Sequence, residues 1–235
     1  MNRMSTVDAR RALAAAQKPA AGVPAYLRWV NRPLGGQVAV VAARWRWTPN
    51  QVTALSAVSG GIGIGILVIS TEWWAGVVAG GLLLVGYVLD SADGQLARIQ
   101  RRGGPAGEWL DHVVDGVRAP LVHVALAIHL LRTDSPPWVA YVALGFSAVV
   151  SAWFLSQLLA EKLLPRPAVH AATEDRNGIF ESFVKQPQDT STTYFALMFA
   201  GLPAIFEFLY IALFVWHVLA FGLSLRRKYA QLTAL

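Results

Sequence analysis

Four aspartates lie close together between two long apolar runs of this sequence. They are Asp90, Asp93, Asp111 and Asp115, in a chain of 235 residues of which only 14% are charged. Ionisable side chains at the edge of membrane-grade apolar segments are costly to desolvate, so they are candidates for function. Neighbouring carboxylates also repel one another unless cations neutralise them. The pattern therefore predicts a site for cations.

The spacing of these aspartates indicates how they could meet. On a helix, Asp90 and Asp93 share one face, and so do Asp111 and Asp115. The intervening segment QRRGGPA, residues 100–106, is typical of a turn, so two antiparallel helices would bring the pairs together. Carboxylate ligands favour Mg²⁺, Mn²⁺ or Ca²⁺ over zinc, and the chain has no Cys for a thiolate site. Two such ions suit displacement at a phosphoryl centre.

Small residues and an arginine complete this pattern at fixed gaps. The stretch reads D-x-x-D-G-x-x-A-R-x8-G-x3-D-x3-D, which resembles the signature of the CDP-alcohol phosphotransferase (CDP-alcohol phosphatidyltransferase) family. Acidic helix ends that contact only water and lipid head groups would explain one or two of the positions, but not the full set. The matching residues are Asp90, Asp93, Gly94, Ala97, Arg98, Gly107, Asp111 and Asp115.

The resemblance implies a fold, a reaction and a set of roles. It implies a six-span membrane enzyme, expected as a homodimer, that moves a phosphoalcohol group from a CDP-alcohol to an acceptor hydroxyl and releases CMP. The four aspartates would hold two divalent cations, Mg²⁺ or Mn²⁺. Asp111 and Asp115 would be catalytic, with Asp115 as general base. The residues implied to contact the nucleotide are Asp90, Asp93, Gly94, Ala97, Arg98 and Gly107.

Three further arginines near the motif have two interpretations each. Arg101 and Arg102 could bind an acceptor phosphate or serve only membrane topology. Arg118 follows Asp115 by one helical turn, where an unpaired charge would be expensive. It could bind a substrate phosphate or pair with an aspartate.

Composition places the chain in a membrane. Hydrophobic residues make up 55% of it, nine residues are Trp, and long apolar runs recur. The net charge of +6 could suggest nucleic acid, but the basic residues flank apolar runs instead of forming one stripe. We therefore expect membrane lipid as a partner and no nucleic acid.

The periodicity predicts an all-α fold with three parts. Residues 1–22 form a polar N-terminal tail, either a short surface helix or disordered. Residues 23–47 form an amphipathic juxtamembrane helix, which Pro33 is expected to divide. Residues 48–235 form the six-helix domain, beginning with Thr48 as N-cap and Pro49 at the first helical position. The expected spans are 50–70, 73–98, 107–131, 138–160, 190–205 and 208–225, with residues 226–228 ending the last.

Two pairs of glycines four residues apart are expected to allow close helix contacts within the bundle. They are Gly61 with Gly65, and Gly76 with Gly80. Self-association through them is the alternative.

Charge bias predicts the orientation. With six spans, nearly all Lys and Arg residues outside the spans fall on one side, and Arg132 alone falls on the other. By the positive-inside rule, both termini and the aspartates are cytosolic, in a bacterial inner membrane.

The substrates are less well determined than the reaction. A site at the membrane surface favours CDP-diacylglycerol as donor and a polar alcohol or alcohol phosphate as acceptor, which is phospholipid biosynthesis. A soluble CDP-alcohol of the CDP-inositol or CDP-amino-alcohol type, with a lipid or soluble acceptor, is the alternative. Gly116 stands where phosphatidylinositol-phosphate synthases typically have Arg. GEWLDHVVD, residues 107–115, resembles amino-alcohol phosphotransferases, and the segment before TPNQVT resembles di-inositol-phosphate-phosphate synthases. These hints conflict, so the acceptor stays open.

Two other functions fit part of the pattern. A cation transporter would also place aspartates within the membrane, but it would not need the Gly, Ala and Arg positions. A catalytically silent scaffold of the same fold would not need an intact motif.

Overall fold

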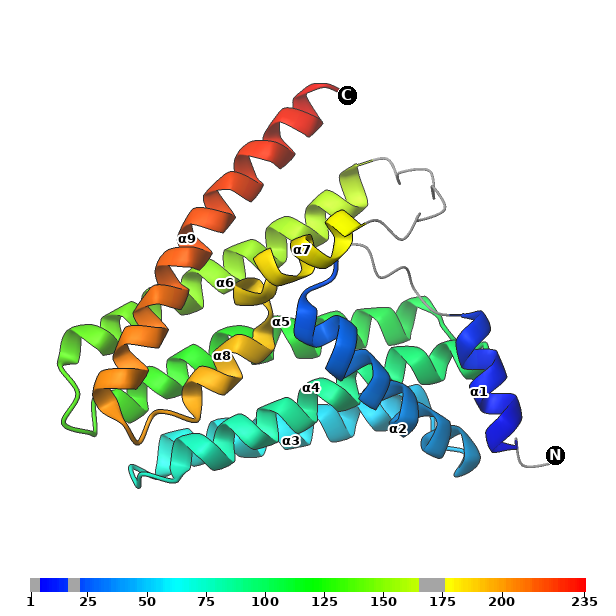
Figure 1. Cartoon of the computed structure of the whole chain (residues 1–235), viewed down its shortest axis with the longest axis horizontal. Helices are drawn as coiled ribbons and strands as arrows, with labels where there is room; N and C mark the ends of the chain where they lie inside the picture. The colour runs from blue at the N-terminus through cyan, green and yellow to red at the C-terminus, as the bar shows by residue number, and fades with distance from the viewer. Residues whose placement is uncertain (1–4, 17–21, 165–175) are drawn as a thin grey trace.

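The computed structural model describes residues 5–16, 22–164 and 176–235, with side chains from residue 178 onward in the last range. All regular elements in these ranges are helical, and α3, α4 and α5 run roughly side by side whereas α9 lies at a steeper angle to them (Figure 1). The elements are α1 Thr6–Ala15, the π-helical turn η1 Leu27–Asn31, α2 Arg32–Arg44, α3 Pro49–Ile69, α4 Ala75–Gln100, α5 Pro105–Leu130, α6 Pro137–Leu163, α7 Arg176–Val184, the 3₁₀ turn η2 Gln186–Gln188, α8 Thr190–Leu197 and α9 Pro203–Thr233.

Five of the described helices are long and apolar enough to cross a membrane: α3, α4, α5, α6 and α9. They correspond to five of the six predicted spans, with ends within a few residues for the first four. Thr48 caps α3 as predicted, because its side chain accepts a hydrogen bond from the backbone N–H of Gln51 and the Gln51 side chain bonds back. The chain is an integral membrane protein.

The predicted span at 190–205 is not one of these five helices. Its helical part is α8, which has eight residues and is therefore about 12 Å long, followed by turns as far as Leu202. The six-span count stays a prediction. The helix of the last predicted span is longer than that span, since α9 continues through residues 226–228 to Thr233, and the end of the span at these residues stays a prediction. Lys and Arg end an apolar stretch, but they are good helix formers.

Helix α4, which carries Asp90 and Asp93, packs against α3, α2 and α8. A Cβ atom on Gly76 would lie 2.2 Å from the carbonyl oxygen of Leu197, and one on Gly80 would lie 2.6 Å from that of Tyr194. These glycines therefore make the close contact with α8 that was predicted within the bundle. The same prediction was wrong for Gly61 and Gly65, because no atom of the described residues lies within 4 Å of such a Cβ position on either glycine.

The N-terminal residues contribute a helix to the fold. Helix α1 packs against α2 and α4, and Ala9 is buried in this contact. Of the two alternatives for the tail, the structure thus has a helix over Thr6–Ala15.

The predicted break at Pro33 was wrong. Asn31 and Arg32 keep helical backbone angles, and the π-helical turn η1 leads directly into α2. Because the wider turn and the start of α2 leave N–H groups unpaired, a residue without an N–H fits there. The outer face of α2 exposes Leu34 and Val41, and Trp45 directly after the helix is also exposed, as in an interfacial helix, but its position at a membrane surface stays a prediction.

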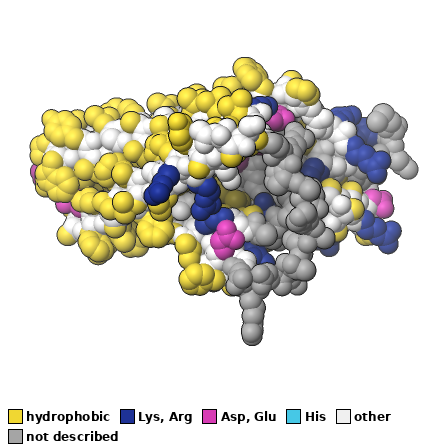
Figure 2. Space-filling model, turned by 90° about the horizontal axis from the view of Figure 1, so that it is seen from above, with side chains coloured by type: hydrophobic (Ala, Val, Ile, Leu, Met, Phe, Trp, Pro, Cys, Tyr) yellow, Lys and Arg dark blue, Asp and Glu magenta, His cyan; other side chains and the backbone are white. Residues whose placement is uncertain are grey.

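The charged end of the bundle is the end at which the aspartates lie. Arg101 ends α4 in the left-handed conformation, with φ 52°, and α5 begins at Pro105, so the predicted turn between the two motif helices is confirmed. Figure 2 shows hydrophobic side chains over the left part of one face, whereas most visible Lys and Arg side chains lie over its middle and right parts. The motif turn lies at the right in Figure 1.

Candidate active site

Three of the four predicted aspartates converge. Asp90 on α4 and Asp111 and Asp115 on α5 each offer a carboxylate oxygen, and these oxygens lie within 4.8 Å of one another. All three side chains are half-buried, so each keeps some contact with solvent. The turn between α4 and α5 therefore brings these three residues together, as their spacing predicted.

The fourth aspartate, Asp93, lies outside this group of oxygens. Its side chain is buried, and the hydroxyl of Thr53 on α3 donates to its Oδ2 at 2.5 Å. The Thr53 hydroxyl is also 3.1 Å from the carbonyl oxygen of Pro49. Asp93 is thus held from the α3 side of the site, one helical turn from Asp90 toward the C-terminal end of α4.

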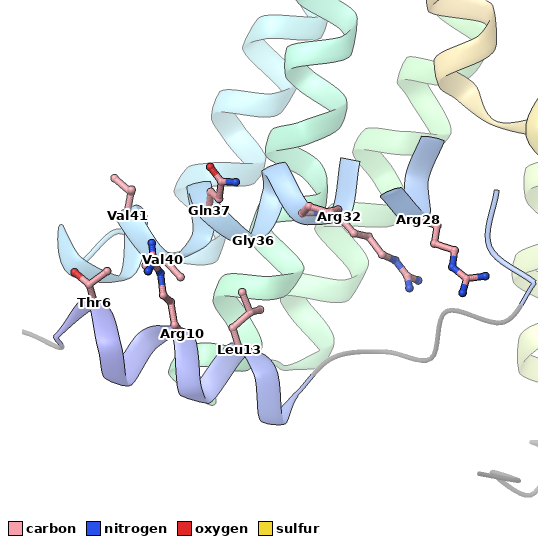
Figure 3. Close-up of a pocket in the computed structure, with 10 residues that line it drawn as sticks. Thr6, Arg10, Leu13, Arg28, Arg32, Gly36, Gln37, Val40 and Val41 are labelled. Carbon is pink, nitrogen blue, oxygen red and sulfur yellow. The ribbon is translucent and has the colours of Figure 1, made fainter. Parts of the chain in front are cut away.

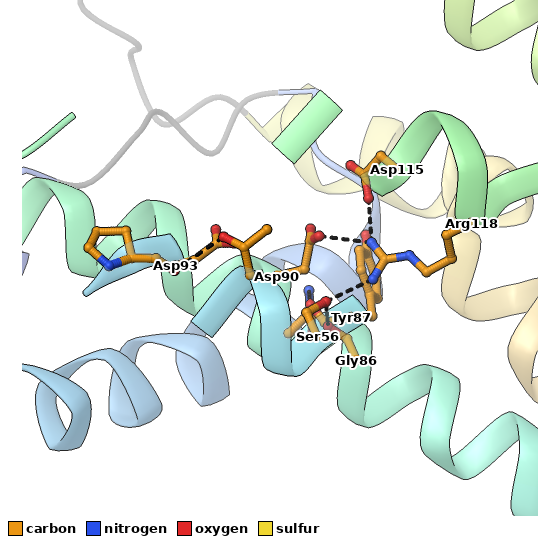
Figure 4. Close-up of polar contacts among 10 residues, drawn as sticks. Ser56, Gly86, Tyr87, Asp90, Asp93, Asp115 and Arg118 are labelled. Carbon is orange, nitrogen blue, oxygen red and sulfur yellow. Dashed lines mark hydrogen bonds and ion pairs between the residues drawn. The ribbon is translucent and has the colours of Figure 1, made fainter. Parts of the chain in front are cut away.

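Arg118 joins two of the clustered aspartates. Its Nη2 donates to Oδ1 of Asp90 at 2.8 Å and to Oδ1 of Asp115, and Figure 4 shows the guanidinium between the two carboxylates. The Arg118 side chain is only 8% exposed. Of the two interpretations of Arg118, the described contacts favour the ion pair with aspartates over a substrate phosphate.

A narrow passage between helices α3 and α4 positions the Arg118 side chain. Its Nη1 donates to the Ser56 hydroxyl at 2.8 Å, and that hydroxyl donates to the carbonyl oxygen of Gly86 at 2.7 Å. A Cβ on Gly60 would lie 3.1 Å from Cδ of Arg118. Small residues on both helices therefore leave room for a long cation that reaches the aspartates from α5.

The remaining motif positions border the same end of the bundle. Arg98 is half-buried, and its Nε is buried with no hydrogen-bond partner among the described residues. A Cβ on Gly94 would meet only Arg98 Nη1, and one on Gly107 only Asn50 Oδ1, both at 3.6 Å. Packing in the described residues therefore does not require either glycine, as expected if the space serves a ligand. Ala97 is half-buried, and its carbonyl oxygen accepts from the Arg102 N–H at 2.9 Å.

Arg101 and Arg102 lie at the exposed turn after α4. Neither side chain has a hydrogen bond or ion pair within the described part of the chain, and the structure does not bring them to the Arg118–aspartate group. Their position is open to solvent, so both interpretations of these residues remain.

Sequence reasoning missed the hydroxyl groups that hold the site from α3. Thr53, Ser56 and Gly60 recur at three- and four-residue steps on the buried face of an otherwise apolar helix. Small polar residues at that period in a span indicate a polar or closely packed neighbour. This signal could have been found.

A second buried polar group below the site was also missed. Tyr87, one turn before Asp90, donates its hydroxyl to Oδ2 of Asp189 at 3.0 Å, and its carbonyl oxygen accepts from Asn31 Nδ2 at 3.2 Å. Asp189 caps α8 by accepting from the Ser191 N–H. Burial raises the pKa of Asp189, and the hydrogen bonds from Ser191 and Tyr87 oppose that shift. These contacts tie η1 and the start of α8 to the motif helix.

A sequence model of one protein family covers most of the chain. The CDP-alcohol phosphatidyltransferase model matches residues 46–224, which include α3–α6 and most of α9. The chain belongs to the CDP-alcohol phosphatidyltransferase family. It is therefore a transferase of substituted phosphate groups, and the family uses a CDP-alcohol donor and an alcohol acceptor. The resemblance inferred from the motif is confirmed.

One curated relative shares part of the chain. The bifunctional IPC transferase and DIPP synthase of Aquifex aeolicus (strain VF5) is 36% identical over 107 residues, which are 45% of this chain and 24% of that protein. The matched part thus spans about a quarter of the relative's length. The relative's name describes activities of that whole protein.

The donor set fits the metal dependence that is general in the CDP-alcohol phosphatidyltransferase family. Clustered carboxylate oxygens are hard ligands of the kind that Mg²⁺ and Mn²⁺ prefer. Asp90, Asp111 and Asp115 could hold such an ion, and Asp93 lies on the same side of α4 as Asp90. Arg118 already neutralises part of their charge.

Proposed function

We propose that this chain transfers the phosphatidyl group of CDP-diacylglycerol to the hydroxyl of a polar alcohol or alcohol phosphate and releases CMP. The contact between α2 and the motif helix α4 is the observation that supports a lipid donor over a soluble one. Gln95 Nε2 on α4 donates to the carbonyl oxygen of Arg32 at 2.9 Å, while the opposite face of α2 exposes Leu34 and Val41. A lipid held at the interface by α2 would lie beside the helix that carries Asp90.

Asp90, Asp93, Asp111 and Asp115 are proposed to hold two divalent cations, Mg²⁺ or Mn²⁺. Such ions supply charge stabilisation for the attacking and leaving oxygens of a phosphoryl displacement. Arg118 keeps Asp90 and Asp115 in place through its two hydrogen bonds. Thr53 does the same for Asp93.

Asp115 is proposed as the general base. Arg118 engages Oδ1 of Asp115, which leaves Oδ2 to accept the proton of the acceptor hydroxyl. The acceptor oxygen then bonds to the β-phosphorus of the donor. The bond from that phosphorus to the bridging oxygen breaks, and CMP departs with the electron pair. Asp111, one turn earlier on α5, shares the site and is proposed as essential.

The nucleotide is proposed to lie over Asp90, Asp93, Gly94, Ala97, Arg98 and Gly107. Arg98 Nε is buried and has no hydrogen-bond partner among the described residues, and it supports this placement because a diphosphate oxygen would satisfy it. The open space beside Gly94 and Gly107 leaves the backbone accessible to a flat ring. Arg101 and Arg102, exposed at the turn, are proposed to attract an anionic acceptor.

The setting of the enzyme is also a proposal. Arg101 and Arg102, which are exposed at the motif turn, support a cytosolic site, and the membrane is proposed to be a bacterial inner membrane. A homodimer is proposed on the family resemblance alone.

A soluble CDP-alcohol is the second candidate donor, and the relative from Aquifex aeolicus favours it. That protein is named a DIPP synthase, and the resemblance of the segment before TPNQVT pointed in the same direction. The same aspartates would serve this reaction.

Release of CMP by the purified protein separates these candidates. CDP-diacylglycerol is supplied with a panel of alcohols and alcohol phosphates, and CDP-inositol and CDP-choline are supplied with the same acceptors. CMP release with CDP-diacylglycerol and abolition by EDTA are expected. CMP release with only a soluble CDP-alcohol would refute the donor assignment, and release undiminished by EDTA would refute the metal site.

A further inference from the structure

Tyr194 on α8 has a buried hydroxyl that makes no hydrogen bond within the described part of the chain. Its side chain is only 1% exposed. Buried polar groups without a partner cost stability and are rare in folded proteins. The hydroxyl has no role in the transfer reaction proposed above, so its position is informative.

The packing of Tyr194 directs this hydroxyl toward the active site. Its ring meets that of Tyr87 edge-on, with ring centroids 6.4 Å apart and an interplanar angle of 88°. Its carbonyl oxygen lies against α4, because a Cβ on Gly80 would be 2.6 Å from it. The hydroxyl interacts electrostatically with Arg118 and Asp115. Tyr194 therefore faces the Arg118–aspartate group from α8.

A substrate does not reach this hydroxyl. Tyr194 lines neither the cavity between α1, η1 and α2 (Figure 3) nor the cavity between α8 and α9. The neighbouring Tyr87 hydroxyl already donates to Asp189. A hydroxyl oxygen accepts hydrogen bonds, and an ionised arginine only donates them. Arg118 is therefore the partner from which the Tyr194 oxygen can accept.

Arg118 needs another acceptor when divalent cations bind to the aspartates. Its Nη2 donates to Asp90 and Asp115, which are two of the carboxylates proposed to hold the cations. A carboxylate oxygen that binds a cation is a poorer acceptor, and the cation repels the guanidinium. The Ser56 hydroxyl accepts from Nη1 and does not replace these bonds. A buried guanidinium without acceptors would be costly.

We propose that Tyr194 is a positioning residue, whose hydroxyl accepts a hydrogen bond from Arg118 Nη2 when Asp90 and Asp115 bind divalent cations. The hydroxyl keeps the guanidinium in the site while the carboxylate oxygens turn to the cations. Without it, Arg118 would compete more strongly with the cations for the same oxygens, and cation binding would weaken. This inference rests on the cation site proposed above.

Tyr194→Phe removes the hydroxyl and keeps the ring that packs on Tyr87. Its Tm is measured in EDTA and over a range of Mg²⁺ concentrations, which gives the Mg²⁺ affinity. In EDTA the variant should keep its Tm within about 2 °C, because the hydroxyl has no described partner to lose. Mg²⁺ should bind it about tenfold more weakly, which is the effect of one lost hydrogen bond to a charged group.

Two further variants show whether the effect depends on Arg118. Tyr210→Phe is the matched control, because it removes a buried tyrosine hydroxyl that is hydrogen-bonded to Nδ1 of His123 at 2.6 Å. It should lower Tm equally in EDTA and in Mg²⁺ and leave the Mg²⁺ affinity unchanged. In the Arg118→Ala protein, the addition of Tyr194→Phe should not change the Mg²⁺ affinity.

The outcomes separate this proposal from the cation site itself. Equal Mg²⁺ affinity in Tyr194→Phe and in the unaltered protein would overturn the proposal and leave the cation site standing. A tenfold weakening that persists in the Arg118→Ala protein, or that also occurs in Tyr210→Phe, would overturn it too. An unaltered protein that Mg²⁺ does not stabilise would overturn both.

Discussion

Arg118→Ala tests the role that the structure gives to the only arginine found bridging the described aspartates. The substitution removes the guanidinium that bonds Asp90, Asp115 and the Ser56 hydroxyl. Two carboxylates then lose their cation, and the Ser56 hydroxyl loses a donor while it keeps its hydrogen bond to the Gly86 carbonyl oxygen. We expect the variant to be less stable than the unaltered protein, and we expect the difference to be largest when no divalent cation is present.

The size of this effect follows from the burial of the pair. Removal of one partner of a buried ion pair costs about 3–5 kcal/mol. Because the Asp115 side chain keeps 33% of its surface exposed, we expect the lower end, about 3 kcal/mol. For a chain of this length that is a fall in Tm of about 6–12 °C. Arg118→Lys keeps the positive charge but not the planar set of N–H donors, so it should recover only part of the stability that Arg118→Ala loses.

Thermal unfolding in detergent, with EDTA or with Mg²⁺, measures the effect. The variant site carries one more net negative charge, so Mg²⁺ should bind it more tightly. Each tenfold gain in affinity adds about 1.4 kcal/mol, or about 3–6 °C, to the stabilisation by Mg²⁺. Mg²⁺ should therefore raise the Tm of Arg118→Ala more than that of the unaltered protein.

The matched control is Arg226→Ala, which removes an exposed cation from α9 and should shift Tm by no more than about 2 °C. Unfolding of Arg118→Ala at the unaltered Tm in EDTA would contradict the stabilising role of the ion pairs. Equal stabilisation of Arg118→Ala and the unaltered protein by Mg²⁺ would contradict the expected gain in Mg²⁺ affinity. An unaltered Tm with a raised KM for one substrate would return Arg118 to the role of a phosphate ligand.

Three further predictions concern the metal site, the packing of α8 and the topology. Asp111→Asn should abolish CMP release while the protein keeps its Tm within about 3 °C, and activity that survives would argue against the metal site. Gly76→Val should lower Tm by more than about 5 °C, because its Cβ would lie 2.2 Å from the Leu197 carbonyl oxygen. Gly61→Val is the control and should change Tm by less than about 2 °C, because its Cβ would meet no atom of the described residues within 4 Å. Similar shifts in both variants would contradict the close α4–α8 contact. A cysteine at Gly104 should be labelled only from the cytosolic side and one at Thr71 only from outside, and the reverse result would overturn the orientation.

The approach of Asp90, Asp111 and Asp115 to one another was predictable, because it depends on the helical period and on the residues of one turn, and both can be read from a short stretch of sequence. Asp111 and Asp115 are one turn apart, and the Gly-Pro turn before α5 brings them to Asp90. The separation of Asp93 from the other three was not predictable in this way. It depends on the rotation of α4 against α3, where Thr53 meets the Asp93 carboxylate, and no local pattern states which face of α4 meets α3.

The limits of the span prediction have a similar cause. Four spans were found within a few residues because capping residues and prolines mark their ends. The span predicted at 190–205 contains a helix, α8, but this helix has only eight residues. Its length was not predictable, because hydropathy is averaged over a window longer than this helix and its close contact with Gly76 and Gly80 is a tertiary feature. The predicted close helix contact at Gly61 and Gly65 was wrong for a similar reason. Their spacing is identical to that of Gly76 and Gly80, so the sequence alone does not tell which pair faces a neighbouring helix.

Helix α9 is a suitable attachment point for a rigid fusion partner in electron microscopy. It runs without a break over 31 residues, or about 46 Å, whereas a hydrocarbon core is about 30 Å thick. The helix is therefore about 16 Å longer than such a core is thick, and Figure 1 shows its C-terminal end standing clear of the other helices. A helical fusion partner joined in register after Thr233, the last residue of α9, would inherit the direction of α9, because a continuous helix transmits orientation where a loop would lose it. A chain of 25.5 kDa could thereby carry a rigid marker large enough to align single particles.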